Sequence, residues 1–97
     1  MHRIRTHPGE ILNEEFLVPL KISARALAAE IDVPPNRITE IIRGERSVSA
    51  DTAIRLGIQF GTTSQFWLNL QQAYDLSKAE RDGDFRKVKA RQREHAA

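Results

Sequence analysis

Residues Ser23 to Gly44 read SARALAAEIDVPPNRITEIIRG, and they predict two short helices joined by a tight turn. In the first helix, four apolar residues recur at positions i, i+3, i+4 and i+7, and so they share one face: Ala24, Leu27, Ala28 and Ile31. Pro34 and Pro35 end this helix, because a residue that precedes proline is pushed out of the α region. Pro35 suits the first position of the next helix, so the stretch has the layout of a helix-turn-helix unit.

The second helix of the pair carries isoleucines on one side and polar residues on the other. Its apolar side is formed by Ile38, Ile41 and Ile42, at i, i+3 and i+4. Gly44 supplies the stop, because glycine takes the left-handed cap conformation without steric cost. The outward side chains are those of Asn36, Glu40 and Arg43, flanked by Arg37 and Thr39. One helix of this size fits the major groove of B-DNA, which is about 12 Å wide.

The outward side chains suit different parts of DNA. Asn36 matches adenine, Glu40 can accept a hydrogen bond from cytosine, and Thr39 can touch the methyl group of thymine. Three arginines nearer the rim are expected to meet phosphates, which give affinity but no sequence information: Arg37, Arg43 and Arg46. Any amphipathic surface helix has a polar face, but the turn with two prolines and the basic loop GERSVS favour DNA binding.

The length of 97 residues fits one small domain with a modest buried surface, for which a dimer is favourable. Cysteine is absent, no signal peptide opens the chain, and no apolar run approaches the roughly 20 residues of a membrane span. A soluble cytoplasmic protein is therefore expected. The net charge is only +2, so the attraction to nucleic acid must be local. Arg3 and Arg5 are either a basic arm or solubilising charge.

Two further helices are predicted on either side of this unit. The segment HPGEILNEEFLVPL suggests a helix over residues 8–16, with Pro19 ending it. After the basic loop, Ser49 can cap a helix over residues 50–60. Gly57 inside that helix costs up to about 1 kcal/mol relative to alanine, which indicates close packing.

The last helix is predicted over QFWLNLQQAYDL, with Thr63 or Ser64 at its cap. Its apolar residues cover more of the circumference than one small core can use, so we expect a second chain to pack there. The predicted dimer interface consists of Phe66, Trp67, Leu70 and Tyr74. In the alternative, Trp67 and Tyr74 close the core of the monomer.

Residues 77–97 are mostly charged, with 7 Lys+Arg against 4 Asp+Glu, whereas residues 1–76 hold 8 against 9. This segment is predicted to be a frayed helix or a disordered tail, with Gly83 as a break. The charges of this segment either are simply solvated or make a contact with phosphate or with a partner protein. Neither a strand pattern nor an internal repeat occurs. The expected fold class is all-α, a five-helix repressor-like domain of residues 1–76 with a charged C-terminal tail.

Three motifs in order carry a resemblance: HPGEIL, then DVPPNRITEIIRGERSVSADTAIRL, then FGTTSQFWLNLQQAYDL. Over about His7 to Leu76 the chain resembles the HigA-type antitoxins, the plasmid-maintenance or virulence-associated-protein-I group of the Xre/Cro-like helix-turn-helix families. The resemblance implies a five-helix domain and a homodimer formed largely through the last helix. It also implies binding to a palindromic operator of its own operon and neutralisation of a HigB-type ribonuclease toxin.

The resemblance also implies roles for individual residues. The positions that meet bases in such folds are here Pro35, Asn36, Arg37, Thr39 and Glu40. The positions that approach the DNA backbone are here Arg43, Gly44 and Arg46. Many Xre-like proteins carry a phosphate-binding glutamine where this chain has Ala24, so that contact is lost or supplied by Ser23 or Arg25. For a toxin, both the tail and the first helix are candidate contact surfaces.

Three other functions are alternatives to DNA binding by an antitoxin. An enzyme has little support, because the histidines lack metal-ligand spacing and neither a glycine-rich phosphate loop nor a cysteine nucleophile occurs. No catalytic residue, metal or cofactor is therefore expected. A pure protein-interaction module would show no operator affinity that falls with salt. A stand-alone Xre-like repressor would lack a neighbouring reading frame that encodes a small basic ribonuclease.

Overall fold

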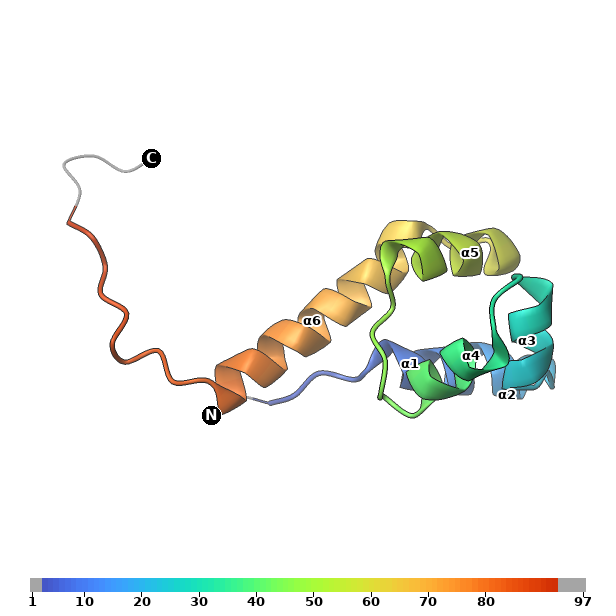
Figure 1. The fold of residues 1–97 in the computed structure, drawn as a ribbon, viewed down its shortest axis with the longest axis horizontal. Coiled ribbons are helices and arrows are strands. Elements are labelled where there is room, and N and C mark those ends of the chain that lie inside the picture. Colours follow the sequence, from blue (N-terminus) through green and yellow to red (C-terminus); the bar gives the residue numbers. More distant parts are fainter. Residues whose placement is uncertain (1–2, 93–97) are drawn as a thin grey trace.

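The computed structural model describes residues 3–92, and within that range the chain forms five helices and no strand (Figure 1). The first helix is continuous through three segments: α1 (Pro8–Ile11), the π-helical segment η1 (Leu12–Leu17) and α2 (Val18–Leu20). The other four are α3 (Ala24–Glu30), α4 (Pro35–Ile42), α5 (Ala50–Phe60) and α6 (Ser64–Asp82). The predicted all-α class with five helices is confirmed.

The first helix ends later than predicted, because Pro19 does not terminate it. The helix continues to Leu20, and the π-helical turn before Pro19 explains how. The N–H of Val18 donates to the carbonyl of Asn13, five residues back, so the hydrogen-bond register has already shifted where proline lacks a donor. The helix then stops at Lys21, whose φ of 57° is left-handed.

The α3–α4 pair is the predicted helix-turn-helix unit. Ser23 caps α3 through its hydroxyl, and the helix ends before Asp32, which takes a left-handed φ of 58°. The N–H of Val33 donates to the carbonyl of Ala28 at 3.0 Å, which closes the turn between the helices. Pro35 occupies the first position of α4, as the sequence predicts.

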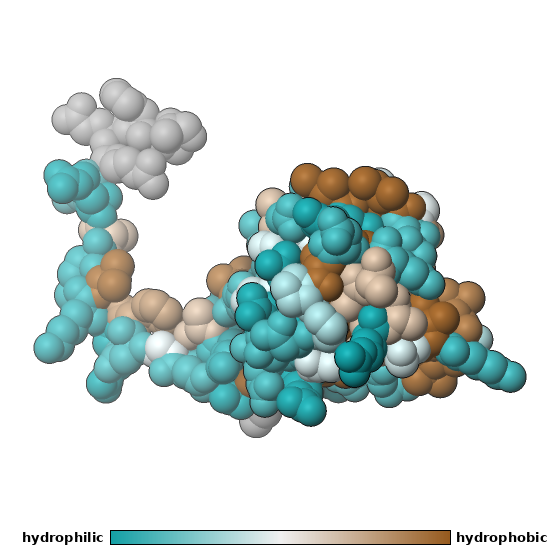
Figure 2. All heavy atoms as spheres, turned by 45° about the vertical axis from the view of Figure 1, so that its right-hand side comes forward, coloured by the Kyte–Doolittle hydropathy of each residue, from teal (hydrophilic) through white to brown (hydrophobic). Residues whose placement is uncertain are grey.

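One hydrophobic core lies between the helices. Its buried apolar residues are Leu12, Leu17, Leu27, Ala28, Ile31, Ile38, Ile41, Val48, Ala53, Leu56 and Trp67. Trp67 is 0% exposed, and its indole N–H donates to the hydroxyl of Thr62 at 2.8 Å. The prediction that Trp67 lies at a dimer interface is therefore wrong, because this side chain offers no surface to a second chain. Hydrophobic side chains of α5 do remain exposed, and hydrophobic surface lies along the top of the molecule (Figure 2).

Two glycines allow backbones to approach each other closely. A Cβ at Gly9 would lie 1.7 Å from the carbonyl oxygen of Ile41, so α1 rests directly on the last turn of α4. A Cβ at Gly57 would lie 2.9 Å from the carbonyl oxygen of Thr62, which confirms the predicted close packing in α5. The first of these contacts joins the start of the described chain to the helix that carries the polar outward face.

Beyond Leu76, α6 runs on to Asp82 and away from the other helices, with Gly83 at its C-cap (Figure 1). The N-terminal segment lies along this projecting part, where the N–H of Arg5 donates to the hydroxyl of Ser77 at 2.8 Å. Within residues 3–92, none of the helices combines the length and the apolar composition that crossing a bilayer requires.

Candidate DNA interface

The two faces of α4 differ as the sequence predicts. Ile38 and Ile41 are each 0% exposed and anchor the helix in the core. Pro35 and Asn36 are exposed at its first turn, and Arg43 is exposed at its end. The polar face of α4 is therefore open on the surface of the subunit, where a groove of DNA can reach it.

Thr39 lies on the same face but is partly engaged by its own helix. Its hydroxyl donates to the carbonyl oxygens of Pro35, at 3.4 Å, and Asn36, at 3.2 Å. Such bonds to carbonyls three and four residues back are common for threonine in a helix. Because they fix the hydroxyl, the methyl group is the part of Thr39 best suited to a base.

Glu40 and Arg46, for which the sequence predicts separate contacts with DNA, form an ion pair. The Nε and Nη2 atoms of Arg46 each lie 2.8 Å from Oε1 of Glu40. The pair links the outward face of α4 to the basic loop that follows it. The carboxylate of Glu40 is therefore held by Arg46 and is not isolated on the face of α4.

Arg37 is tied to α5 through Asp51, a contact that the sequence analysis did not predict. Its Nη1 atom lies 3.5 Å from Oδ2 of Asp51, and the same oxygen accepts a bond from Nε of Arg55 at 2.9 Å. Arg55 also donates from Nη1 to the carbonyls of Ile31, at 2.8 Å, and Asp32, at 3.2 Å. Exposed ion pairs add little stability, about 0–1 kcal/mol, so this network orients the turn and α4 more than it stabilises them. In the sequence, the i, i+4 spacing of Asp51 and Arg55 could have predicted the ion pair between these two residues.

The residues predicted to contact phosphates lie at the start of α3 and at the end of α4 with the loop that follows it. Ser23 accepts from the N–H of Ala26 at 3.0 Å, so its hydroxyl oxygen is already used as a helix cap. Arg25 is exposed on α3. Gly44 has a left-handed φ of 76° and donates its N–H to Ile41 at 3.0 Å, so it shapes the turn after α4 and offers no free donor.

His7, which lacks metal-ligand spacing in the sequence, caps the first helix. Its Nδ1 accepts from the N–H of Gly9 at 2.9 Å, and its ring packs edge-on against Tyr74 of α6 at 4.7 Å. Burial lowers the pKa of His7 below its ordinary value. Weaker charge effects come from Asp75 and Glu10, which raise the pKa, and from Lys78, which lowers it. The bond from Gly9 requires that Nδ1 carry no proton.

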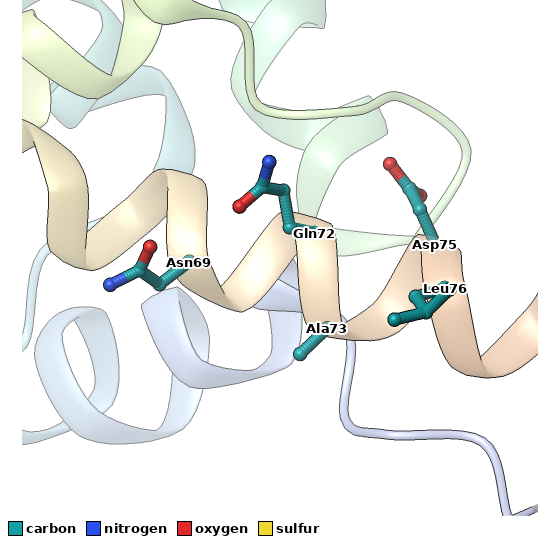
Figure 3. Close-up of a pocket in the computed structure, with 5 residues that line it drawn as sticks. All are labelled: Asn69, Gln72, Ala73, Asp75 and Leu76. Carbon is teal, nitrogen blue, oxygen red and sulfur yellow. The ribbon is translucent and has the colours of Figure 1, made fainter. Parts of the chain in front are cut away.

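A second surface feature is a shallow hollow along α6 (Figure 3). It is lined by Asn69, Gln72, Ala73, Asp75 and Leu76. Leu76 is 62% exposed and Phe66, a turn before the hollow, is 37% exposed. Leu70 and Tyr74 are half-buried against the subunit itself. The exposed apolar surface of α6 is thus centred closer to Leu76 than the predicted interface was.

An exposed second helix of a helix-turn-helix pair, held on a helical core, defines a class of DNA-binding domain. The chain belongs to the helix-turn-helix family, whose sequence profile matches residues 14–67.

Among its relatives, virulence-associated protein I of Dichelobacter nodosus is 57% identical over 76 residues, which cover 78% of this chain and 70% of that protein. The fold is also similar to that of the Pseudomonas aeruginosa antitoxin HigA with the higBA promoter. That structure has 49% identity and a TM-score of 0.77, over 78% of this chain and 83% of that one. The antitoxin GraA in complex with its operator has 43% identity and a TM-score of 0.85, over 99% and 97% of the two chains.

Proposed function

We propose that this chain is a sequence-specific DNA-binding antitoxin of a type II toxin-antitoxin system, which represses its own operon and neutralises a HigB-type ribonuclease toxin. The observation that supports this function most directly is the polar face of α4, open while its isoleucines are buried. The similarity to HigA with its promoter and to GraA with its operator supports the same reading. The function requires neither catalysis nor a cofactor, and it places the protein with the DNA in the cytoplasm.

In this function α4 enters the major groove with its first turn against the bases. Asn36 pairs with an adenine, and Thr39 and Pro35 contact neighbouring base edges. Arg37, held by Asp51, reads an adjacent base or its phosphate. Arg25 and Arg43 bind phosphates on either side, and Arg46, paired with Glu40 of α4, approaches the backbone from the loop.

A palindromic operator requires two copies of α4, and we assign the contact between copies to α6. Its hollow leaves apolar surface at Ala73 and Leu76 uncovered in the subunit, with Phe66 nearby. Two copies related by a twofold axis would bury this surface and place the recognition helices about 34–36 Å apart, one turn of DNA.

Fluorescence anisotropy with the promoter of this chain's own operon tests the DNA assignment. The affinity should fall steeply with salt, because phosphate contacts release counterions. Asn36→Ala should cost about 1–3 kcal/mol and relax the preference at one base position in each half-site. Gln92→Ala, which removes an exposed amide in the tail, is the matched control. An unchanged preference of Asn36→Ala across an operator library would contradict this role.

The toxin assignment has a separate test. The proposal requires that the reading frame beside this gene encode a small basic ribonuclease, and that its cleavage of RNA stop when the chain is added in equimolar amount. Continued cleavage, together with intact operator binding, would identify a stand-alone repressor.

A further inference from the structure

The outer side of α5 carries apolar side chains that nothing in the subunit covers. Ile54 is 51% exposed and Ile58, one turn later, is 80% exposed. Figure 2 shows the hydrophobic side chains that lie along the top of the molecule, where α5 runs. Two isoleucines at i and i+4 form one continuous apolar ridge.

A groove with an acidic rim adjoins this ridge, between α5 and the end of α3. It is lined by Glu30, Ile31, Asp32, Arg55, Ile58 and Gln59. The guanidinium of Arg55 is occupied by Asp51 and by the carbonyls of the turn. Glu30 and Asp32 are both exposed, so the groove presents more negative than positive charge.

The charge of this groove disfavours two of the possible occupants. DNA phosphates would be repelled by Glu30 and Asp32 and would gain nothing from the isoleucines. A second copy of the chain, docked about a twofold axis through this surface, would place the same excess of negative charge on both sides of the contact. The occupant must therefore be cationic and partly apolar. A ribonuclease has such a surface, because it needs lysines and arginines to hold the phosphates of RNA.

We propose that the ridge of Ile54 and Ile58, with the acidic groove beside it, docks the cationic RNA-binding surface of the toxin. This inference rests on the proposed function. The carboxylates of Glu30 and Asp32 take the place of RNA phosphates, and the isoleucines bury apolar surface of the toxin beside them. The open face of α4 stays free, so one chain holds operator DNA and toxin at the same time.

Three matched substitutions compare the candidate surfaces. Ile58→Glu alters the ridge, Val18→Glu alters the first helix and Val88→Glu alters the tail; the three original side chains are 80%, 59% and 74% exposed. The probe is the purified, catalytically inactivated ribonuclease encoded beside this gene, titrated by calorimetry into each full-length variant. Ile58→Glu should weaken binding about tenfold or more, while the two other variants bind as the original chain does.

A charge reversal provides a second measurement. Glu30→Lys should weaken toxin binding and reduce its dependence on salt, whereas Glu80→Lys on α6 should change neither. All variants should bind operator DNA as the original chain does, which also shows that they are folded.

The contrary outcomes are distinct. Unchanged toxin binding by Ile58→Glu overturns the docking surface, and loss of binding by Val18→Glu or Val88→Glu moves it to the first helix or the tail. A smaller sedimentation mass for Ile58→Glu would show that α5 joins two copies of the chain, which also overturns the inference. If the original chain binds no toxin, the proposed function itself fails.

Discussion

Replacing Gly9 with alanine tests whether α1 rests on the end of α4 as tightly as the structure shows. The new Cβ would lie 1.7 Å from the carbonyl oxygen of Ile41 and 2.5 Å from its carbonyl carbon. A carbon and a carbonyl oxygen rarely approach closer than about 3.3 Å, so the two backbones must separate by about 1.6 Å. Neither neighbour is a flexible side chain, and Leu12, which directly follows α1, is 0% exposed, so this shift disturbs the core.

The expected loss follows from two opposing terms. Overpacking against rigid backbone costs about 3 kcal/mol, at the upper end of the usual range. Alanine gains at most about 1 kcal/mol over glycine in a helix. Gly9→Ala should therefore lower the free energy of unfolding by about 2 kcal/mol, which for a chain of this size lowers Tm by about 8–16 °C.

Urea denaturation and thermal melting measure this loss, and Gly61→Ala is the matched control. Gly61 has a left-handed φ of 72°, but a Cβ added there would have no neighbouring atom within 4 Å, so alanine costs only the conformational strain, about 1 kcal/mol. If Gly9→Ala is as stable as the original chain, or loses no more than Gly61→Ala, the close contact between α1 and α4 is refuted.

Three further substitutions have defined outcomes. Arg43→Ala should weaken binding to all DNA sequences about equally and flatten the salt dependence by about one phosphate, and a preserved slope would remove Arg43 from the DNA. Because burial lowers the pKa of His7, the unfolded chain takes up a proton first as the pH falls below about 6.5. The contribution of His7 to stability should be fully present above that pH and should be lost as the pH falls below it. The urea midpoint measures this decline. His7→Asn, which retains a cap acceptor, should lack this part of the pH dependence. Trp67→Ala should cost about 3–5 kcal/mol of stability without changing the sedimentation mass of the folded protein, whereas a smaller mass would place Trp67 between subunits.

The elements that the sequence predicts correctly are those set by neighbouring residues. The spacing of Ile38 and Ile41 puts both on one face of α4, opposite its polar residues, because a helix repeats every 3.6 residues, and the structure buries this face. The cap at Ser49 and the stop at Gly44 are equally local. Pro19 is the exception, because the π-helical turn before it belongs to no simple periodic pattern.

The candidate site was only partly predictable for a related reason. The outward position of Asn36 follows from the helical period, but the pairing of Arg37 with Asp51 joins residues on different helices. Likewise, an apolar pattern along α6 cannot distinguish a residue such as Trp67, which faces the core, from Leu76, which faces outward. Both side chains are apolar, so the pattern alone predicts burial for each of them.

By itself, the sequence determined five helices, the turn between α3 and α4, and the side of α4 that stays polar. These features depend on backbone preferences and on side-chain spacing within one or two turns. Only the tertiary structure decided that α1 touches the end of α4 at Gly9, that Arg55 links α5 to the turn, and which apolar residues remain uncovered. These contacts join residues far apart in the chain, and their distances depend on how the helices pack.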